Sequence, residues 1–194
     1  PEVETIARNL RQGHNGKPPM VGKRIVGVEL LWPRTLVEPD VKALVARLQH
    51  QLVQDVGRRG KYLLINLPKD TLVFHLRMSG DLYLEAETAP IALHRRLVLT
   101  LDDSSCKARF RLVFNDPRKF GRIWLLADPS SLLGELGPEP LDEAFTPQWL
   151  YRELQKRQRQ LKPLLLDQTF LAGLGNIYTD EALHRAHLHP LTIS

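Results

Sequence analysis

The sequence predicts an α+β protein in which an N-terminal antiparallel β-sandwich, flanked by helices, precedes a helical domain. Two observations carry this prediction. Between residues 61 and 126, strand-like stretches follow one another without intervening helices, which is typical of antiparallel sheets. After a Pro/Gly-rich connection, residues 146–194 have helical patterning. We therefore divide the chain into a β-sandwich domain at 1–130, a linker at 131–145 and a helical domain at 146–194.

Each element has its own signal in the sequence. Helices are expected over the first ten residues and over 39–50, because apolar residues recur there at i, i+3, i+4 and i+7. Thr146 and Pro147 suit the cap and first turn of a further helix. The strands expected from apolar stretches bounded by polar turns are Arg24–Trp32, Lys61–Leu67, Thr71–Met78, Asp81–Glu85, Arg96–Leu101, Ala108–Phe114 and Arg122–Leu126.

The composition excludes several classes of protein. The chain has 194 residues, 43% hydrophobic and 25% charged, which favours a folded core over disorder. Cys106 is the one cysteine, so an internal disulfide framework is excluded and a reducing compartment is favoured. No apolar run reaches the roughly 18 residues needed to span a bilayer. The net charge of +5 favours a polyanionic partner, although many basic chains have none.

Two turns between expected strands place apolar side chains beside polar ones. In Asn115-Asp-Pro-Arg-Lys-Phe-Gly121, a cation, Arg118, stands two residues before an aromatic ring, Phe120. If exposed, such a pair could enter a duplex, with the ring wedging a base step and the guanidinium bonding an orphaned base. The alternative is that Phe120 belongs to the core. Met78, beside a Ser-Gly turn, presents the same choice between a wedge and a core filler.

Basic residues gather at three further places. Lys61 follows Arg58-Arg-Gly and could be a surface charge or a proton-transfer group whose pKa is lowered by cationic neighbours. The segment His94-Arg-Arg96 begins a strand and could contact phosphate. In the helical domain, residues 151–162 carry five cations against one acid, which indicates either a helix that tracks phosphates or a solvated face.

A glycine turn connects two of the expected helices. In Leu171-Ala-Gly-Leu-Gly-Asn-Ile-Tyr178, Asn176 can cap a helix over Ile177–Ala186. Amide groups exposed at the start of a helix attract anions. Taken alone, a glycine turn of this kind can equally be structural.

Together, seven segments resemble the formamidopyrimidine-DNA glycosylase family, the bacterial enzymes that remove 8-oxoguanine and ring-opened purines. The segments occur in family order over nearly the whole chain. They are Pro-Glu-Val-Glu-Thr at 1–5, Arg-Arg-Gly-Lys-Tyr-Leu at 58–63, His-Leu-Arg-Met-Ser-Gly at 75–80, Asn-Asp-Pro-Arg-Lys-Phe-Gly at 115–121, Leu-Gly-Pro-Glu-Pro-Leu at 136–141, Leu-Leu-Leu-Asp-Gln-Thr at 164–169 and Gly-Leu-Gly-Asn-Ile-Tyr at 173–178.

The resemblance implies a fold, an activity and a partner. The implied fold is a two-layer β-sandwich with helices, then a helix–two-turn–helix domain. The implied activity is base-excision repair by a monomeric glycosylase and AP lyase on double-stranded DNA with oxidised bases, in the bacterial cytoplasm and away from membranes. The damaged base is flipped out of the stack. An N-terminal proline then attacks the sugar C1′ as a secondary amine and forms a Schiff base, after which β- and δ-elimination cut the strand.

The resemblance also implies roles for particular residues. Lys61 matches the lysine that assists base release and β-elimination. Met78, Arg118 and Phe120 match the trio that fills the void left by the flipped nucleotide, with Arg118 facing the orphan cytosine. The remaining positions match DNA contacts, mostly to phosphates, and they are His75, His94, Arg157, Lys162 and Asn176.

Both ends of the chain depart from the family pattern. The family begins Pro-Glu-Leu-Pro-Glu-Val-Glu-Thr, whereas this sequence begins at the second Pro-Glu. We therefore expect the nucleophile to lie upstream of this sequence; the alternative is a shifted register in which Pro1 and Glu2 are catalytic. The sequence also stops before the family's C-terminal four-cysteine finger. We accordingly expect no metal or cofactor in this chain, and one structural zinc in the finger of a longer enzyme.

Two other functions are also compatible with the sequence. The endonuclease VIII-like branch shares the implied fold and removes oxidised pyrimidines, but it usually lacks the separated trio that Met78, Arg118 and Phe120 resemble. A non-catalytic fragment that binds damaged DNA would need the basic and wedge residues without the nucleophile.

Overall fold

The computed structural model describes residues 1–103 and 108–194, which form two compact units, Pro1–Pro129 and Ser130–Ser194. Cys106 lies outside the described residues. The strands are β1 (Arg24–Leu30), β2 (Leu36–Glu38), β3 (Asp55–Arg59), β4 (Tyr62–Asn66), β5 (Thr71–His75), β6 (Asp81–Ala86), β7 (Arg95–Asp103), β8 (Ala108–Asn115) and β9 (Arg122–Leu126). The helices are α1 (Glu2–Gln12), η1 (Pro33–Thr35, a 3-10 turn), α2 (Val41–Leu48), α3 (Ser130–Leu133), α4 (Pro147–Gln155), α5 (Leu161–Leu166) and α6 (Asn176–Arg185).

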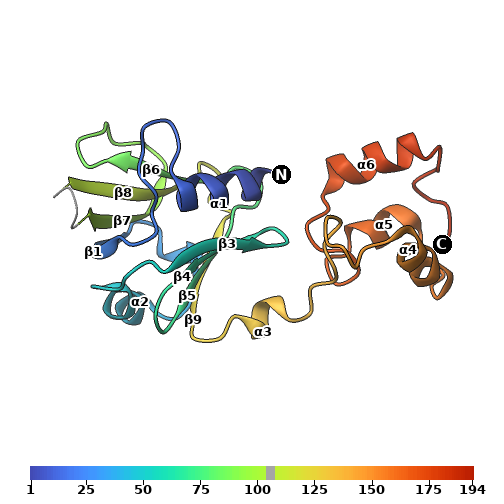
Figure 1. Cartoon of the computed structure of the whole chain (residues 1–194), viewed down its shortest axis with the longest axis horizontal. Coiled ribbons are helices and arrows are strands. Elements are labelled where there is room, and N and C mark those ends of the chain that lie inside the picture. Colours follow the sequence, from blue (N-terminus) through green and yellow to red (C-terminus); the bar gives the residue numbers. More distant parts are fainter. Residues whose placement is uncertain (104–107) are drawn as a thin grey trace. The chain divides into compact units, whose positions relative to one another are not determined.

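The strands of the first unit form two sheets (Figure 1). One has four strands in the order β1-β7-β8-β6, and the other has five in the order β2-β9-β5-β4-β3. Neighbouring strands are antiparallel, as predicted, except that β2 runs parallel to β9. The strands β2 and β3 were absent from the prediction.

A single apolar core lies between the two sheets. Alternate residues of the central strands face it, so that Leu63 and Ile65 of β4 meet the side chains of Leu97 and Leu99 of β7 within one buried cluster. The rings of Phe74 on β5 and Phe114 on β8 pack edge to face across it, with centroids 5.5 Å apart. The expected sandwich is therefore present, with its register set by the period-2 alternation of apolar residues.

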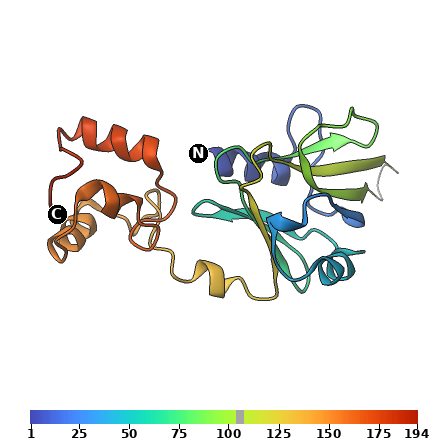
Figure 2. The same cartoon turned by 180° about the vertical axis from the view of Figure 1, so that it is seen from behind.

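Helix α1 packs against β3, β4 and β6, strands that belong to both sheets, and α2 packs against β1 (Figure 2). The buried side chains of α1 are Ala7 and Leu10, from the expected apolar face. Helix α2 is capped by Asp40, whose carboxylate accepts the N–H of Ala43 at 2.9 Å. Between α1 and β6 lies a small cavity.

The second unit has its own small core. Leu164, Phe170 and Leu171 are buried in it, and the ring of Trp149 on α4 lies 5.8 Å from that of Phe170. Helix α4 begins as predicted, because Thr146 accepts the N–H of Trp149 at 3.1 Å and Pro147 opens the first turn. No helix in the described ranges is both long enough and apolar enough to cross a membrane.

The Pro/Gly-rich connection is part of this second unit. The N–H of Gly137 donates to the carbonyl of Gln168 at 3.0 Å, and the N–H of Ala172 donates to that of Pro138 at 2.9 Å. A Cβ on Gly137 would stand 2.5 Å from the carbonyl oxygen of Phe170, so only glycine fits there. The connection thus docks on the turn that follows α5.

Candidate nucleic-acid interface

Three turns that carry predicted site residues leave the same end of the sandwich. In the five-stranded sheet, Tyr62 pairs with His75, and His75 pairs with Arg122. In the four-stranded sheet, Asn115 pairs with both Asp81 and Arg95 at the corresponding ends of their strands. The turns next to these residues are Gly60–Lys61, Leu76–Gly80 and Asp116–Gly121. The antiparallel registers therefore bring Lys61, Met78 and the loop with Arg118 to one edge, although they are far apart in sequence.

The loop at Asp116–Gly121, which we call the tip loop, is organised around one buried carboxylate. Asp116 is fully buried. Its Oδ2 accepts the N–H of Gly121 at 2.8 Å, and its Oδ1 accepts the N–H of Arg118 at 3.2 Å. A Cβ on Gly121 would stand 2.4 Å from the ring of Phe114, so the loop closes tightly against the core.

The same carboxylate connects the tip loop to the turn that carries Met78. The hydroxyl of Ser79 donates to Oδ1 of Asp116 at 2.6 Å. Burial alone would raise the pKa of Asp116, but the hydrogen bonds from Ser79 and from the tip-loop amides outweigh burial and lower it. Asp116 is thus an ionised acceptor at neutral pH that fixes two turns at once. Sequence reasoning missed it, although an Asp before Pro is a known signal for a turn.

The tip loop presents an exposed ring and an exposed cation. Phe120 is 48% exposed, so the alternative that it belongs to the core is wrong. The guanidinium carbon of Arg118 lies 4.9 Å from the Phe120 ring centroid, within cation–π range. Met78 is 72% exposed, so it is not a core filler either. The three side chains that resemble the family's trio are all available to a partner.

Lys61 occupies a two-residue hairpin turn. Arg59 of β3 pairs with Tyr62 of β4, which leaves Gly60 and Lys61 as the turn, and Gly60 has the positive φ of 56° that such a turn requires. Burial lowers the pKa of Lys61 below its ordinary value. We expected a lowered pKa from the cationic neighbours; desolvation is instead the cause.

His75 stands beside this turn as a neutral imidazole. Its Nδ1 accepts the N–H of Arg77 at 3.1 Å, so the proton of the neutral ring lies on Nε2. Burial, with the positive charges of Arg77 and Lys61, lowers the pKa of His75 to about 4. Any contact that His75 makes to phosphate at neutral pH is therefore a neutral hydrogen bond and not an ion pair.

The segment at His94–Arg96 divides into one exposed residue and two buried ones. His94 is exposed, and its carbonyl accepts the N–H of Asp116 at 2.9 Å, which places it beside the tip loop. Arg95 is paired with Glu85 at 2.6 Å, and Nε of Arg96 donates to the carbonyl of Asp116 at 2.8 Å. The idea that these two arginines contact phosphate is wrong, because both are buried and support the fold.

The first turn of α1 also reaches this end of the sandwich. The carboxylate of Glu4 is paired with Nε of Arg58 at 2.7 Å. Arg58 stands three residues before Lys61 in the sequence. The N-terminus of the chain accordingly lies near the hairpin of β3 and β4 (Figures 1 and 2). Pro1 precedes α1 as its cap residue, and Glu2 is the first helical residue.

In the second unit, the basic run is not one helix. Helix α4 ends at Gln155, and α5 begins at Leu161, so the run spans two helices and a bend. Arg157 is paired with Glu153 at 2.7 Å, and its guanidinium carbon lies 4.9 Å from the ring of Phe170. Lys162 is paired with Asp180 of α6 at 2.7 Å.

Asn176 has a different position from the one expected. It is the first residue of α6, and the cap residue is Gly175, with no side-chain hydrogen bond at the cap. The prediction that Asn176 caps the helix is therefore wrong. The reason lies in the preceding turn, where Gly173 has a φ of 90° and donates its N–H to the side chain of Gln168 at 3.0 Å. The side chain of Asn176 is exposed at the N-terminus of α6.

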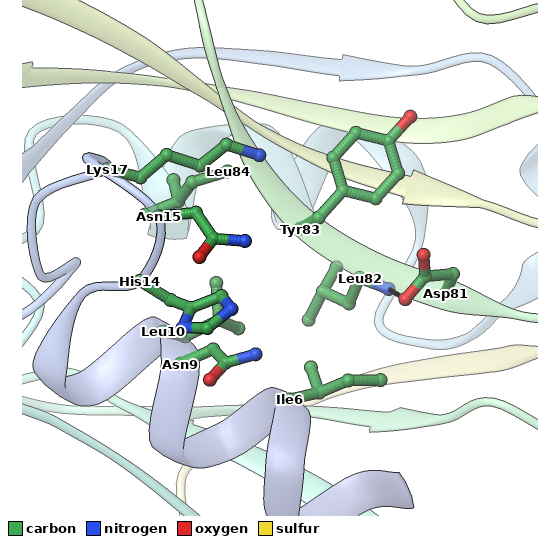
Figure 3. Close-up of a pocket in the computed structure, with 10 residues that line it drawn as sticks. All are labelled: Ile6, Asn9, Leu10, His14, Asn15, Lys17, Asp81, Leu82, Tyr83 and Leu84. Carbon is green, nitrogen blue, oxygen red and sulfur yellow. Dashed lines mark hydrogen bonds between the residues drawn. The ribbon is translucent and has the colours of Figure 1, made fainter.

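The cavity between α1 and β6 is separate from these turns (Figure 3). It has a volume of about 240 Å³, with Ile6 and Leu10 on one wall and Tyr83 on another. Its lining includes none of the predicted site residues.

As for metals, the part of the chain that the structure describes has no group of three or more His, Cys, Asp or Glu side chains placed to hold a metal ion.

Two family models cover most of the chain. The formamidopyrimidine-DNA glycosylase N-terminal domain matches residues 1–123, and the H2TH domain of the same family matches residues 136–194. The chain belongs to the formamidopyrimidine-DNA glycosylase family. This confirms the resemblance read from the sequence motifs, and the two matched ranges follow the division into two units.

Individual relatives agree with the family models. A formamidopyrimidine-DNA glycosylase of Pelotomaculum thermopropionicum is 46% identical over 195 residues, which cover 98% of this chain and 67% of the relative. That of Symbiobacterium thermophilum is 45% identical and is covered over 60% of its length. The chain thus spans about two thirds of the length of the curated relatives it matches.

Solved structures give the same result for the fold. The Lactococcus lactis Fpg protein (MutM) in complex with DNA containing Fapy-dG matches with a TM-score of 0.85 at 35% identity, over 99% of this chain and 69% of that one. A complex of the same protein with DNA containing an abasic site matches with a TM-score of 0.85 at 34% identity.

Proposed function

We propose that this chain recognises oxidised purines in double-stranded DNA and supplies most of the catalytic surface of a base-excision-repair glycosylase with AP lyase activity. The observation that carries the proposal is the link through Asp116, which holds the turn with Met78 and the tip loop with Arg118 and Phe120 together. Relatives named as formamidopyrimidine-DNA glycosylases, and neighbours solved with Fapy-dG DNA, support the same substrate class.

In this proposal the exposed trio enters the duplex. Phe120 wedges a base step, Met78 fills the space left by the flipped nucleotide, and Arg118 bonds the orphaned base opposite it. The separate positions of Met78 and the tip loop favour the purine branch over the endonuclease VIII-like branch. The ring of Phe120 stacks with Arg118 in the free protein, so both side chains are positioned before DNA arrives.

Lys61 is the proposed proton-transfer group. Burial lowers its pKa, which raises the fraction of neutral amine able to accept a proton during base release and β-elimination. In the reaction that family membership implies, a secondary amine bonds to C1′ while the bond from C1′ to the base breaks. Pro1 and Glu2 take that part only in the shifted register.

The remaining predicted contacts bind the backbone. His75 and His94 would donate to phosphates from the first unit, while Arg157, Lys162 and Asn176 would do so from the second. We propose that the protein acts as a monomer on the bacterial nucleoid, in the cytoplasm, and that the family's structural zinc belongs to a finger outside this sequence.

The test compares two lesions in one duplex sequence. The chain is incubated with DNA carrying 8-oxoguanine opposite cytosine and with a matched duplex carrying thymine glycol, and base release, strand cleavage and borohydride-trapped adduct are measured. We expect this chain to bind the 8-oxoguanine duplex in preference to the other and to give little or no trapped adduct, because the nucleophile is expected upstream of Pro1. Preference for thymine glycol would instead assign the chain to the pyrimidine branch. Lesion binding without base release or adduct, by a chain extended with the upstream nucleophile, would leave the non-catalytic module.

A further inference from the structure

Trp32 belongs to none of the motifs above, yet it stands beside the tip loop. It lies between β1 and η1 and is half-buried. The N–H groups of Leu31 and Trp32 both donate to the carbonyl of Arg96, at 2.9 and 3.3 Å. Since Arg96 also donates to the carbonyl of Asp116, Trp32 is fixed to the same support as the tip loop.

Two cations face the indole ring of Trp32. The Lys119 ammonium lies 4.2 Å from its centroid, and the Arg34 guanidinium carbon lies 5.7 Å from it. Both distances fall within the range of about 6 Å in which the ring quadrupole attracts a cation. Two neighbouring cations of the tip loop thus contact different aromatic rings. Arg118 lies over Phe120, and Lys119 lies over Trp32.

The backbone supports this arrangement. Lys119 has a φ of 63°, a left-handed conformation that a residue with a side chain adopts at a cost. The hydroxyl of Thr35 donates to the carbonyl of Gly121 at 2.7 Å, and Nη1 of Arg122 reaches the carbonyl of Arg34 at 3.4 Å. Residues 31–35 and the tip loop are therefore joined at several points.

The charges of Arg34 and Lys119 are not neutralised. Both side chains are exposed, and within residues 1–103 and 108–194 neither forms a salt bridge. An aromatic face orients a cation without cancelling its charge, whereas a carboxylate cancels it. The Trp32 ring therefore orients the two cationic side chains while their charges stay available to bind a polyanion.

We propose that Arg34 and Lys119, held by Trp32, form a phosphate-binding strip that contacts the duplex backbone beside the tip loop. The strip deepens the proposed function and rests on it, since its partner is the same DNA. Trp32 is a positioning residue in this proposal, while the two cations make the contacts. The strip supplies sequence-independent affinity, in contrast to the wedge residues.

The first experiment measures the salt dependence of binding to undamaged duplex DNA with the full chain. The double variant Arg34→Gln/Lys119→Gln is compared with Lys42→Gln/Lys69→Gln, which removes two exposed cations from α2 and from the turn between β4 and β5. Each phosphate contact contributes about −0.9 to the slope of log K against log salt, so the strip variant should lose about 1.8. Between about 50 and 200 mM salt, the affinity of the control should then fall about 12-fold more than that of the strip variant.

The outcomes separate this proposal from the proposed function. If the chain binds duplex DNA and both double variants have the same slope, the strip is overturned and the proposed function stands. If the unaltered chain binds no duplex, damaged or undamaged, both are overturned.

A second experiment tests the role of Trp32. Trp32→Leu keeps both cations but removes the ring, so it should lower both the duplex affinity and the slope, while Trp32→Phe should restore most of both. Circular dichroism and thermal melting establish that each variant is folded. Unchanged binding by folded Trp32→Leu would refute the positioning role. If Trp32→Leu does not fold, it is set aside, and Trp32→Phe is then the test. The positioning role would be refuted if Trp32→Phe had the same low duplex affinity and slope as the Arg34→Gln/Lys119→Gln variant.

Discussion

The cations of the two units have different surroundings. Around the tip loop, Arg118, Lys119 and Arg34 are directed by aromatic rings. In the second unit, Lys162 is paired with a carboxylate, as are Lys156 and Arg159 nearby. Arg157 has both the carboxylate of Glu153 and the ring of Phe170 beside it. A ring leaves the charge of a cation available, and a carboxylate does not. Among the described residues, the three cations around the tip loop form no salt bridge, whereas four of the five cations of the basic run do.

This difference suggests a division of labour. The first unit offers charges and wedges that are ready to bind, whereas the second unit must exchange internal ion pairs for contacts to DNA. Exposed ion pairs contribute little to stability, typically 0–1 kcal/mol, so such an exchange is cheap.

The largest effect is expected at the hairpin turn. In a longer enzyme that carries the upstream nucleophile, Lys61→Ala should slow excision of 8-oxoguanine by about 100-fold or more, since it removes the proposed proton-transfer group, while duplex affinity stays nearly unchanged. Single-turnover kinetics and a binding titration measure the two quantities, with Lys69→Ala as the control lysine. A parallel loss of turnover and affinity would show that Lys61 is structural.

The next largest effect is expected at the support of the tip loop. Asp116→Ala leaves buried donors of Ser79 and Gly121 without an acceptor, and should lower the free energy of unfolding by about 3 kcal/mol. Urea denaturation measures this change, and Asp55→Ala, at an exposed carboxylate on β3, is the control. Equal effects of the two substitutions would contradict the role assigned to Asp116.

The same residue makes stability depend on pH. Because the pKa of Asp116 is lower in the folded than in the unfolded protein, its contribution is complete above the ordinary value of 3.8 and is lost as the pH falls further, through the folded pKa. Asp116→Asn should therefore flatten the pH dependence of unfolding below pH 3.8. An unaltered profile would mean that Asp116 titrates normally.

A smaller effect is expected at the wedge. Phe120→Ala should reduce the preference for lesion over undamaged DNA by about tenfold, yet change the free energy of unfolding by less than about 1 kcal/mol, because the ring is largely exposed. Phe114→Ala, at a fully buried ring, should cost about 3–5 kcal/mol and serves as the contrast. Similar melting temperatures for the two variants would mean that Phe120 is packed in the core.

The smallest effect is expected in the second unit, and it has the opposite sign. Glu153 pairs with both Lys156 and Arg157, whose hydrogen bonds lower its pKa. Glu153→Gln should release both cations and raise the affinity for undamaged duplex by about threefold. Glu143→Gln, at another exposed acid in this unit, controls for net charge. The same gain from both variants would remove the contrast between the units.

The sequence predicted the architecture better than the details. Alternating apolar residues revealed the central strands, because those strands face a core. It did not reveal β3, whose sequence Asp-Val-Gly-Arg-Arg belongs to a polar edge strand, or β2, which has three residues. The parallel pairing of β2 with β9 depends on the short turn η1, which has no apolar period.

The site was predicted in part, for similar reasons. Motifs identified Lys61 and the trio, but Asp116, which orders the tip loop around Phe120, also accepts a hydrogen bond from Ser79, 37 residues earlier in the chain. The basic run contained one acid in its own sequence, while Asp167 and Asp180, which pair with its cations, lie beyond it. Local composition cannot show contacts of this kind. The prediction that Asn176 caps α6 was wrong because a glycine turn, and not a side chain, sets the start of that helix.

The buried carboxylate of Asp116 has a consequence for how binding energy is used. A flexible loop loses conformational entropy when it orders on its partner, and that loss is subtracted from its affinity. Here the ordering occurs once, when the chain folds, and its cost falls on protein stability instead. A search along DNA then meets a preorganised probe, which can test each base step without refolding.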